Sequence, residues 1–270
     1  MERRHVALVT GGGRGIGRAI ALRVARAGAA VFVAARSQEA CIAVVDEIVD
    51  GGGTAWPLYL DVADFSMFDE ALAEARELAG GIGAIDWLVN NAGIAVSAPF
   101  LQHGRAGGED LYAKHLDVNF HGPRRLIEAL VPGMIERKYG RVVNVASSAG
   151  LHGHAYVAAY CASKHALVGY SVSAAKELAK TGVTMNLVCP HYVDSPMTDA
   201  SVERIVAKTK RSEAETRALL AAQNPGGALV TGDEVADAVL ALLQGDQNGA
   251  VAELVGARMG VNEGEAVRWR

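Results

Sequence analysis

Short, continuously apolar runs alternate along the chain with longer amphipathic stretches. The apolar runs predict β-strands, and they lie at Val6–Val9, Val31–Ala35, Ala55–Leu60, Ile85–Asn90, Arg141–Ala146, Thr184–Cys189 and Val251–Val255. The amphipathic stretches predict helices at Ile16–Ala27, from a cap at Ser37 to Asp50, at Ser66–Ala79, Glu109–Lys138, Tyr156–Lys180 and, after a capping box at Thr231–Glu234, Val235–Leu243. Pro123 and Pro132 are expected to interrupt the helix at Glu109–Lys138.

Strands that alternate with helices indicate right-handed βαβ units and a parallel sheet. Because the strands are apolar throughout, helices are expected to cover both faces of that sheet. The expected fold class is therefore α/β, a single Rossmann-type doubly wound parallel sheet of about seven strands. No composition break or internal repeat divides the chain, so residues 1–270 are expected to form one domain. The polar, helix-prone stretch at about 197–227 is interpreted as a lid inserted over a site.

Composition narrows the classes of function. The chain has 270 residues, of which 50% are hydrophobic and 21% charged, and its formal net charge is −4. A chain without basic excess is a poor candidate for binding nucleic-acid phosphates. Cys41, Cys161 and Cys189 lie far apart without metal-ligand spacing, so we expect buried thiols, no metal site and a reducing compartment. The first apolar run ends at Val9 and no long apolar stretch follows, so a soluble cytoplasmic protein is expected.

The glycine-rich sequence Thr10–Gly17 lies where the first strand turns into the first helix. Glycines at such a turn let the backbone approach a pyrophosphate, and the helix N-terminus favours its charge. The second strand ends at Ala35 and Arg36, without the carboxylate that usually binds the ribose 2′-hydroxyl in NAD enzymes. Arg14 and Arg36 could instead hold a 2′-phosphate, so NADP(H) is the expected cofactor. The alternative is that both arginines are solvated surface residues.

Tyr160 and Lys164 lie four residues apart on a predicted helix, so both side chains fall on one face. A nearby ammonium stabilises a phenolate, and it is expected to lower the Tyr160 pKa from its ordinary value of about 10. Ser147 follows the fifth strand, at the carboxyl edge of the sheet, where ligands bind in open α/β folds. The alternatives are surface decoration for the pair and turn capping for the serine.

In combination, these motifs resemble the short-chain dehydrogenase/reductase family in its single-domain branch, over about Val6–Val255. The region Tyr156–Met197 is most similar to reductases that act on 3-oxoacyl groups carried by acyl carrier protein. The matching motifs, each at a predicted strand end or on a helix, are Thr10–Gly17, Asp61-Val62, Asn90–Gly93, Asn119, Ser147, Tyr160, Lys164 and Pro190.

The resemblance implies a role for each matching residue. Tyr160 would protonate the carbonyl oxygen during reduction, and Ser147 would hydrogen-bond that oxygen. Lys164 would bind the nicotinamide ribose, and Asn119, in a distorted helix turn, would hold a water linked to Lys164. The full expected cofactor site comprises Gly11, Arg14, Gly15, Ile16, Gly17, Arg36, Asp61, Val62, Asn91, Ala92, Gly93, Tyr160, Lys164, Pro190, Val193 and Ser195.

The sequence departs from the family pattern near the expected substrate. His191 stands where a glycine usually follows the proline, and the strand Val251–Val255 lacks the usual Asp-Gly-Gly ending. Ser195 replaces the usual threonine but keeps a hydroxyl. The tail beyond Gly256 has no family counterpart. The side chains of His152, His154 and Tyr156 are interpreted either as lining the substrate pocket or as filling a loop.

The resemblance implies an NADP(H)-dependent oxidoreductase that interconverts a ketone and a secondary alcohol. A 3-oxoacyl thioester is the favoured substrate. The alternatives are steroid, sugar or xenobiotic alcohols, or a different class altogether, a non-catalytic NADP-binding regulator. A homotetramer or homodimer is expected, because the two long helices at Glu109–Lys138 and Tyr156–Lys180 carry apolar residues that one sheet face cannot bury entirely, and such helices pair across a two-fold axis in the family.

Overall fold

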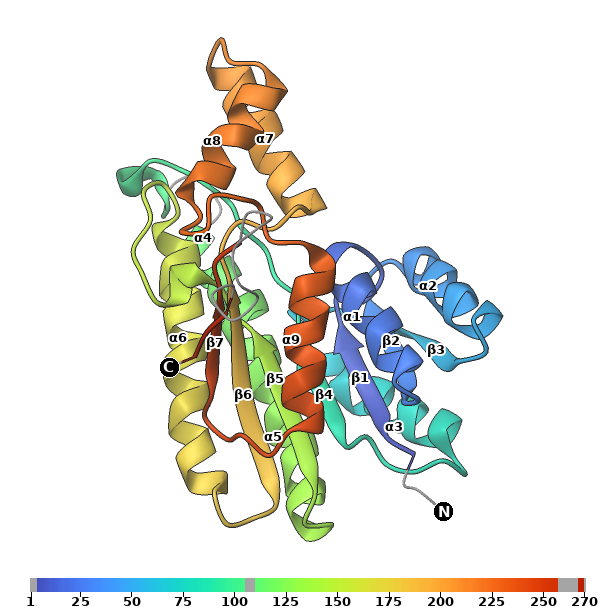
Figure 1. Cartoon of the computed structure of the whole chain (residues 1–270). Coiled ribbons are helices and arrows are strands. Elements are labelled where there is room, and N and C mark those ends of the chain that lie inside the picture. Colours follow the sequence, from blue (N-terminus) through green and yellow to red (C-terminus); the bar gives the residue numbers. More distant parts are fainter. Residues whose placement is uncertain (1–3, 105–109, 257–266, 270) are drawn as a thin grey trace.

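The computed structural model describes residues 4–104, 110–256 and 267–269, and its centre is one eight-stranded sheet (Figure 1). The first seven strands are parallel and have the order β3-β2-β1-β4-β5-β6-β7. Their bounds are β1 Val6–Thr10, β2 Ala30–Ala35, β3 Thr54–Tyr59, β4 Trp87–Asn90, β5 Gly140–Val145, β6 Val183–Pro190 and β7 Val251–Leu254. The predicted doubly wound α/β sheet is confirmed.

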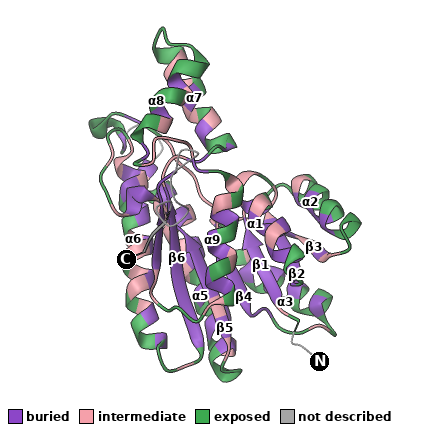
Figure 2. Cartoon of the chain, in the orientation of Figure 1, coloured by how far each residue is buried: buried purple, intermediate pink, exposed green. Residues whose placement is uncertain are grey.

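Two helical layers cover the sheet. One face is covered by α1, α2 and α9, and the other by α3, α5 and α6. The bounds of the α-helices are α1 Gly15–Arg26, α2 Gln38–Asp50, α3 Phe68–Ala79, α4 Leu111–Leu116, α5 Gly122–Glu136, α6 Ala158–Leu178, α7 Pro196–Lys208, α8 Glu213–Gln223 and α9 Gly232–Gln244. Figure 2 shows buried residues along the strands and exposed ones on the outer sides of these helices.

The register of β1 explains why its sequence is apolar without alternation. Ala7 and Val9 pack with the α1, α2 and α9 layer, whereas Val6 and Leu8 pack with the α3, α5 and α6 layer. Successive side chains of a strand point to opposite faces, and both faces are dry here. Each residue of this strand therefore gains from burial, at about 25 cal/mol per Å² of apolar surface removed from water.

Two features differ from the sequence-based expectations. The tail contributes an eighth strand, β8 at Val267–Trp269, which pairs antiparallel with β7. The predicted helix at Glu109–Lys138 consists of α4, a π-helical turn at Asp117–His121 and α5. Pro123 lies in the first turn of α5, where a missing N–H costs little, and Pro132 lies inside α5 without ending it.

The stretch interpreted as a lid forms a helical hairpin. In Figure 1, α7 and α8 project from the upper end of the molecule, away from the sheet. Figure 2 shows that most of their surface is exposed or half-buried. Few side chains of the hairpin are buried; the most buried are Val202, Thr216 and Leu220. That this hairpin acts as a lid stays a prediction.

We predict that Gly17→Ala destabilises the fold, because a Cβ at this position would lie 2.0 Å from the Gly11 carbonyl oxygen and 2.5 Å from Asn91 Nδ2. Overpacking of this kind costs roughly 1–3 kcal/mol and should lower Tm by several degrees in a thermal melt. Gly81→Ala is the matched control, since nothing lies within 4 Å of its added Cβ. Equal melting temperatures for the two variants would contradict this packing argument.

Candidate active site

The ends of β1 and β4 are tied together at the carboxyl edge of the sheet. Thr10 Oγ1 accepts hydrogen bonds from the backbone N–H groups of Asn91 (3.0 Å) and Ala92 (3.1 Å). Asn91 Nδ2 donates in return to the Thr10 carbonyl at 3.0 Å. The glycine-rich turn that follows β1 is therefore held against the Asn91–Gly93 segment.

The turn itself fits a dinucleotide phosphate. Gly11 and Gly15 have φ values of +65° and +54°, a conformation that favours glycine. A Cβ on Gly15 would lie 3.2 Å from Pro196 Cδ, so the N-termini of α1 and α7 approach one another. Within the described residues, neither N-cap, Arg14 nor Ser195, caps its helix with a side-chain hydrogen bond. Free backbone N–H groups at two converging helix ends suit an anion such as a pyrophosphate.

The expected adenosine residues lie at the ends of β2 and β3. Arg36 is exposed, and its Nη1 lies 3.9 Å from Asp61 Oδ2. Asp61 Oδ1 accepts a hydrogen bond from the Ala63 N–H at 3.0 Å. Val62 is buried, and its carbonyl oxygen would lie 2.4 Å from a Cβ on Gly122. A loose, exposed ion pair contributes little stability, so the Arg36 guanidinium can readily exchange its partner for a ligand phosphate.

Helix α6 carries both Tyr160 and Lys164, and it places Tyr160 beside Ser147. Lys164 is buried, and its Nζ donates to the Val145 carbonyl at 2.9 Å and lies 5.9 Å from the Tyr160 ring centroid. Ser147 lies two residues after the end of β5, and its hydroxyl is hydrogen-bonded to the Tyr160 phenol. The serine also caps a short 3₁₀ turn by accepting from the Ala149 N–H at 3.1 Å. Its structural and chemical roles are therefore compatible.

Asn119 lies in the π-helical turn between α4 and α5, so the expected distortion of this helix is present. It is fully buried. Its Oδ1 accepts from the Ile94 N–H at 2.9 Å, and its Nδ2 donates to the Ile94 carbonyl and to Ser163 Oγ, each at 3.0 Å. A Cβ on Gly93 would lie 3.2 Å from Asn119 Oδ1 and 3.7 Å from Lys164 Nζ. Asn119 therefore joins the loop after β4 to the helix that carries Tyr160.

The expected lowering of the Tyr160 pKa is wrong for this structure. Loss of solvation raises the pKa of Tyr160 to about 12, although the hydrogen bond with Ser147 acts in the opposite direction. The same burial lowers the pKa of Lys164 to about 8. Each shift favours the uncharged form of the buried group. Near neutral pH Tyr160 is a protonated phenol, which is the form that can donate a proton.

Pro190 ends β6, the loop after it carries Val193 and Ser195, and side-chain hydrogen bonds hold this loop at two points. Asn224 accepts from the Tyr192 N–H at 2.9 Å and donates to the Tyr192 carbonyl at 2.8 Å. Thr198 Oγ1 donates to the Val193 carbonyl at 2.6 Å, and Ser195 Oγ donates to the same oxygen at 3.3 Å. These hydrogen bonds fix the path of the loop.

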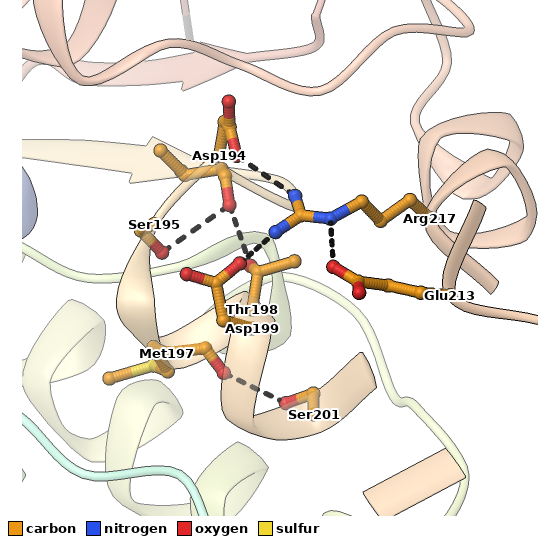
Figure 3. A network of polar contacts seen from close by, with 9 residues as sticks. Asp194, Ser195, Met197, Thr198, Asp199, Ser201, Glu213 and Arg217 are labelled. Carbon is orange, nitrogen blue, oxygen red and sulfur yellow. Dashed lines mark hydrogen bonds and ion pairs between the residues drawn. The ribbon is translucent and has the colours of Figure 1, made fainter. Parts of the chain in front are cut away.

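Arg217 on α8 connects the helical hairpin to this loop, as Figure 3 shows. Its guanidinium pairs with Asp194 at 3.0 Å, with Glu213 at 3.3 Å and with Asp199 on α7. These contacts raise the pKa of Arg217 further above its ordinary value. Sequence analysis missed this residue, because Asp194 and Asp199 are 23 and 18 positions away and belong to no motif.

The residues proposed to line a substrate pocket lie beside the same edge. His152 and His154 follow the Ser147 turn, and burial together with the neighbouring His191 and His152 lowers the pKa of His154. Tyr156 is exposed and has a φ of +66°, an unusual conformation for a tyrosine. The Ala98 N–H donates to its carbonyl at 2.9 Å. Whether these side chains contact a substrate stays a prediction.

Over residues 4–104, 110–256 and 267–269, no group of histidine, cysteine or acidic residues is arranged to hold a metal ion. Cys41, Cys161 and Cys189 are all buried, and no disulfide joins them. In the same part of the chain, no helix combines the length and the apolar character needed to span a bilayer.

Comparison with known proteins identifies the family of this chain. A family profile described as short chain dehydrogenase matches residues 5–205, so the chain belongs to the short-chain dehydrogenase/reductase family. It is 33% identical to the 3-oxoacyl-[acyl-carrier-protein] reductase of Escherichia coli strain K12, over 96% of each chain. It is 38% identical to the enzyme of that name from Staphylococcus aureus, over 74% of this chain and 79% of that one.

Solved structures agree. A variant of actinorhodin polyketide ketoreductase with NADPH superposes with a TM-score of 0.87 at 32% identity, over 95% of this chain and 97% of that one. A levodione reductase superposes with a TM-score of 0.84 at 28% identity, over 93% and 96%. The protein is therefore an oxidoreductase of ketones and alcohols that uses a nicotinamide cofactor.

We predict that Arg217→Met weakens cofactor binding, because α8 would no longer be paired with Asp194 in the loop that contains Val193 and Ser195. The KM for the cofactor should rise roughly two- to tenfold in steady-state kinetics, as expected for an exposed but multiply bonded arginine. Arg204→Met is the control, since Arg204 bonds to Ala200 and Ser201 of its own helix. A cofactor KM equal to that of the control would contradict the prediction.

Proposed function

We propose that the protein is an NADP(H)-dependent reductase that converts a ketone into a secondary alcohol, in the cytoplasm. The observation that carries this proposal is the convergence of Tyr160, Ser147 and Lys164 at the sheet edge where two helix N-termini approach one another. A dinucleotide phosphate suits the helix ends, and an acid–base group suits a carbonyl placed beside them.

Each residue of the site has a part in the proposed reaction. The reduced nicotinamide, when bound, supplies the hydride for the carbonyl carbon. Tyr160 holds its phenolic proton and gives it to the carbonyl oxygen as negative charge develops there. Ser147 hydrogen-bonds that oxygen and keeps it within reach of the phenol. Lys164 binds the ribose hydroxyls, and Asn119 holds a water that connects Lys164 to solvent.

NADP(H) is favoured over NAD(H) by the charges near the expected 2′-position. Arg14 and Arg36 are exposed cations at the N-terminus of α1 and the end of β2. Ala35 provides no carboxylate that would repel a phosphate. The ketoreductase with NADPH named above has the same fold.

A 3-oxoacyl thioester is the proposed substrate. The support is the resemblance to enzymes named for that reaction, which covers up to 96% of this chain. Levodione reductase has a similar fold, so a cyclic ketone is the second candidate. NADPH consumption with a panel of 3-oxoacyl thioesters and cyclic ketones decides between them. A non-catalytic regulator is disfavoured, since it would not need the complete set of Asn119, Ser147, Tyr160 and Lys164.

We predict that Ala35→Asp/Arg36→Leu shifts cofactor preference toward NADH. An arginine–phosphate contact provides roughly ten- to a hundred-fold selectivity, and the added carboxylate repels the 2′-phosphate. The measurement is the ratio of kcat/KM values for NADPH and NADH. Arg26→Leu, a change at the opposite end of α1, should leave the ratio unaltered. A wild-type enzyme that prefers NADH would contradict the assignment.

Removing the Tyr160 hydroxyl should abolish most of the activity. Tyr160→Phe is expected to lower kcat by about 10²–10⁴-fold, because a positioned general acid contributes that much. Its cofactor affinity and Tm should stay close to the wild-type values. If this variant kept more than about a tenth of wild-type kcat, another group would have to be the proton donor.

We expect the enzyme to be a homotetramer, or failing that a homodimer. The C-terminal part of α6 borders a surface hollow of about 270 Å³, which is lined by Val172, Ala175, Lys176, Ala179, Asn248 and Gly249. A second copy would remove this surface from water. Sedimentation velocity at several concentrations measures the state. A stable monomer with full activity would overturn the expectation.

A further inference from the structure

A buried glutamate lies next to the proposed active site without a part in the proposed reaction. Glu253 on β7 is only 1% exposed. Its Oε1 accepts a hydrogen bond from His191 Nε2 at 3.0 Å and lies 3.4 Å from His152 Nε2. This contact fixes the orientation of the His191 ring toward β7.

The two histidines come from different parts of the site. His191 follows Pro190 and begins the loop that carries Val193 and Ser195. Its backbone N–H donates to the Leu254 carbonyl at 3.0 Å. His152 ends the turn that starts at the proposed substrate-binding serine, and its N–H donates to the Ser148 carbonyl at 2.8 Å. One carboxylate therefore bridges the cofactor loop and the serine turn.

Glu253 is also close to the acid–base residues. It is paired in register with Cys189 of β6. Cys189 packs in one apolar cluster with Ala146, the residue before Ser147. Cys189 is near enough to Tyr160 and Lys164 to influence both electrostatically. Glu253 thus lies one strand away from Cys189, which influences both Tyr160 and Lys164.

The two departures from the family pattern noted in the sequence are in contact here. His191 replaces a usual glycine, and Glu253 belongs to the strand that lacks the usual ending. A buried carboxylate is costly without a partner, and an imidazole that replaces a glycine next to the cofactor loop needs a fixed orientation. His191 therefore gives the buried Glu253 carboxylate a partner, and Glu253 fixes the orientation of the His191 ring.

We propose that Glu253 is a positioning residue that sets, through His191 and His152, the spacing between the Ser147 turn and the loop at residues 191–195. The proposal rests on the proposed reductase function for its catalytic consequence. Its structural consequence is independent of substrate. Loss of the carboxylate would loosen both segments together, and misplacement of reacting groups lowers kcat more than substrate KM.

The chain offers a matched control on the opposite edge of the sheet. Asp86 is 1% exposed, its Oδ2 lies 3.0 Å from His5 Nδ1, and its Oδ1 accepts from the Val6 N–H at 3.0 Å. It is a second buried carboxylate paired with a histidine, but it precedes β4 at the amino edge. Asp86→Asn should therefore reproduce the loss of stability of Glu253→Gln without reaching the active site.

The experiment measures amide hydrogen exchange and steady-state kinetics for Glu253→Gln, His191→Gly, the double variant and Asp86→Asn. We expect faster exchange at both 147–152 and 191–195 in Glu253→Gln, with a roughly tenfold lower kcat and a substrate KM within about twofold. The double variant should lose less than the two single variants combined, because both substitutions remove the same His191–Glu253 contact.

The proposal would be overturned if Glu253→Gln kept wild-type exchange rates and a wild-type kcat while its Tm fell as much as that of Asp86→Asn. The contacts of Glu253 with the two histidines would then serve stability alone. Additive losses in the double variant would also overturn it. Exchange needs neither cofactor nor substrate. A wild-type protein without reductase activity would therefore refute the proposed function while the exchange data still decided the role of Glu253.

Discussion

A buried ammonium group determines how the proposed active site is arranged. Lys164 is 4% exposed and donates to the Val145 carbonyl at the end of β5. Burying a charged amine is costly unless it is hydrogen-bonded, so α6 must lie where that carbonyl is within reach. Gly150, in the 3₁₀ turn after β5, allows this close approach, because a Cβ there would lie 2.8 Å from the Lys164 carbonyl oxygen.

A polar ladder within the core holds the same helix at a second level. Asn90 donates to Asn144 at 2.8 Å, and Asn144 donates to Ser171 on α6 at 2.8 Å. All three residues are buried, and a hydrogen-bonded network in a dry interior permits little variation in geometry. The register of α6 on the sheet is thereby specified, and with it the positions of Tyr160 and Lys164. The protonation states follow from the same burial, since it disfavours both the phenolate and the ammonium.

The strands, the order of the main helices and the strand-end motifs could be predicted from sequence, because they follow from local pattern. Continuous apolar runs such as Val6–Val9 mark buried parallel strands, and a turn that carries Gly11 and Gly15 tolerates few other residues. Long-range pairs could not be predicted. His191 and Glu253 are 62 positions apart, and neither residue type indicates its partner. The sequence predicts a lowered pKa for Tyr160, whereas the structure raises it. The spacing reveals the neighbouring charge of Lys164 but not the loss of solvation.

The central claim is that Tyr160 and Lys164 share one desolvated site whose burial keeps the phenol protonated. The most direct measurement is a difference absorbance titration of the cofactor-free protein, wild type against Tyr160→Phe, over the pH range in which circular dichroism shows an intact fold. At a pH of about 10 an ordinary tyrosine is half ionised, but Tyr160 should contribute no phenolate absorbance there. Its phenolate signal should appear only at higher pH, with a pKa of about 12. Half-ionisation of Tyr160 at or below about pH 10 in the folded protein would contradict it.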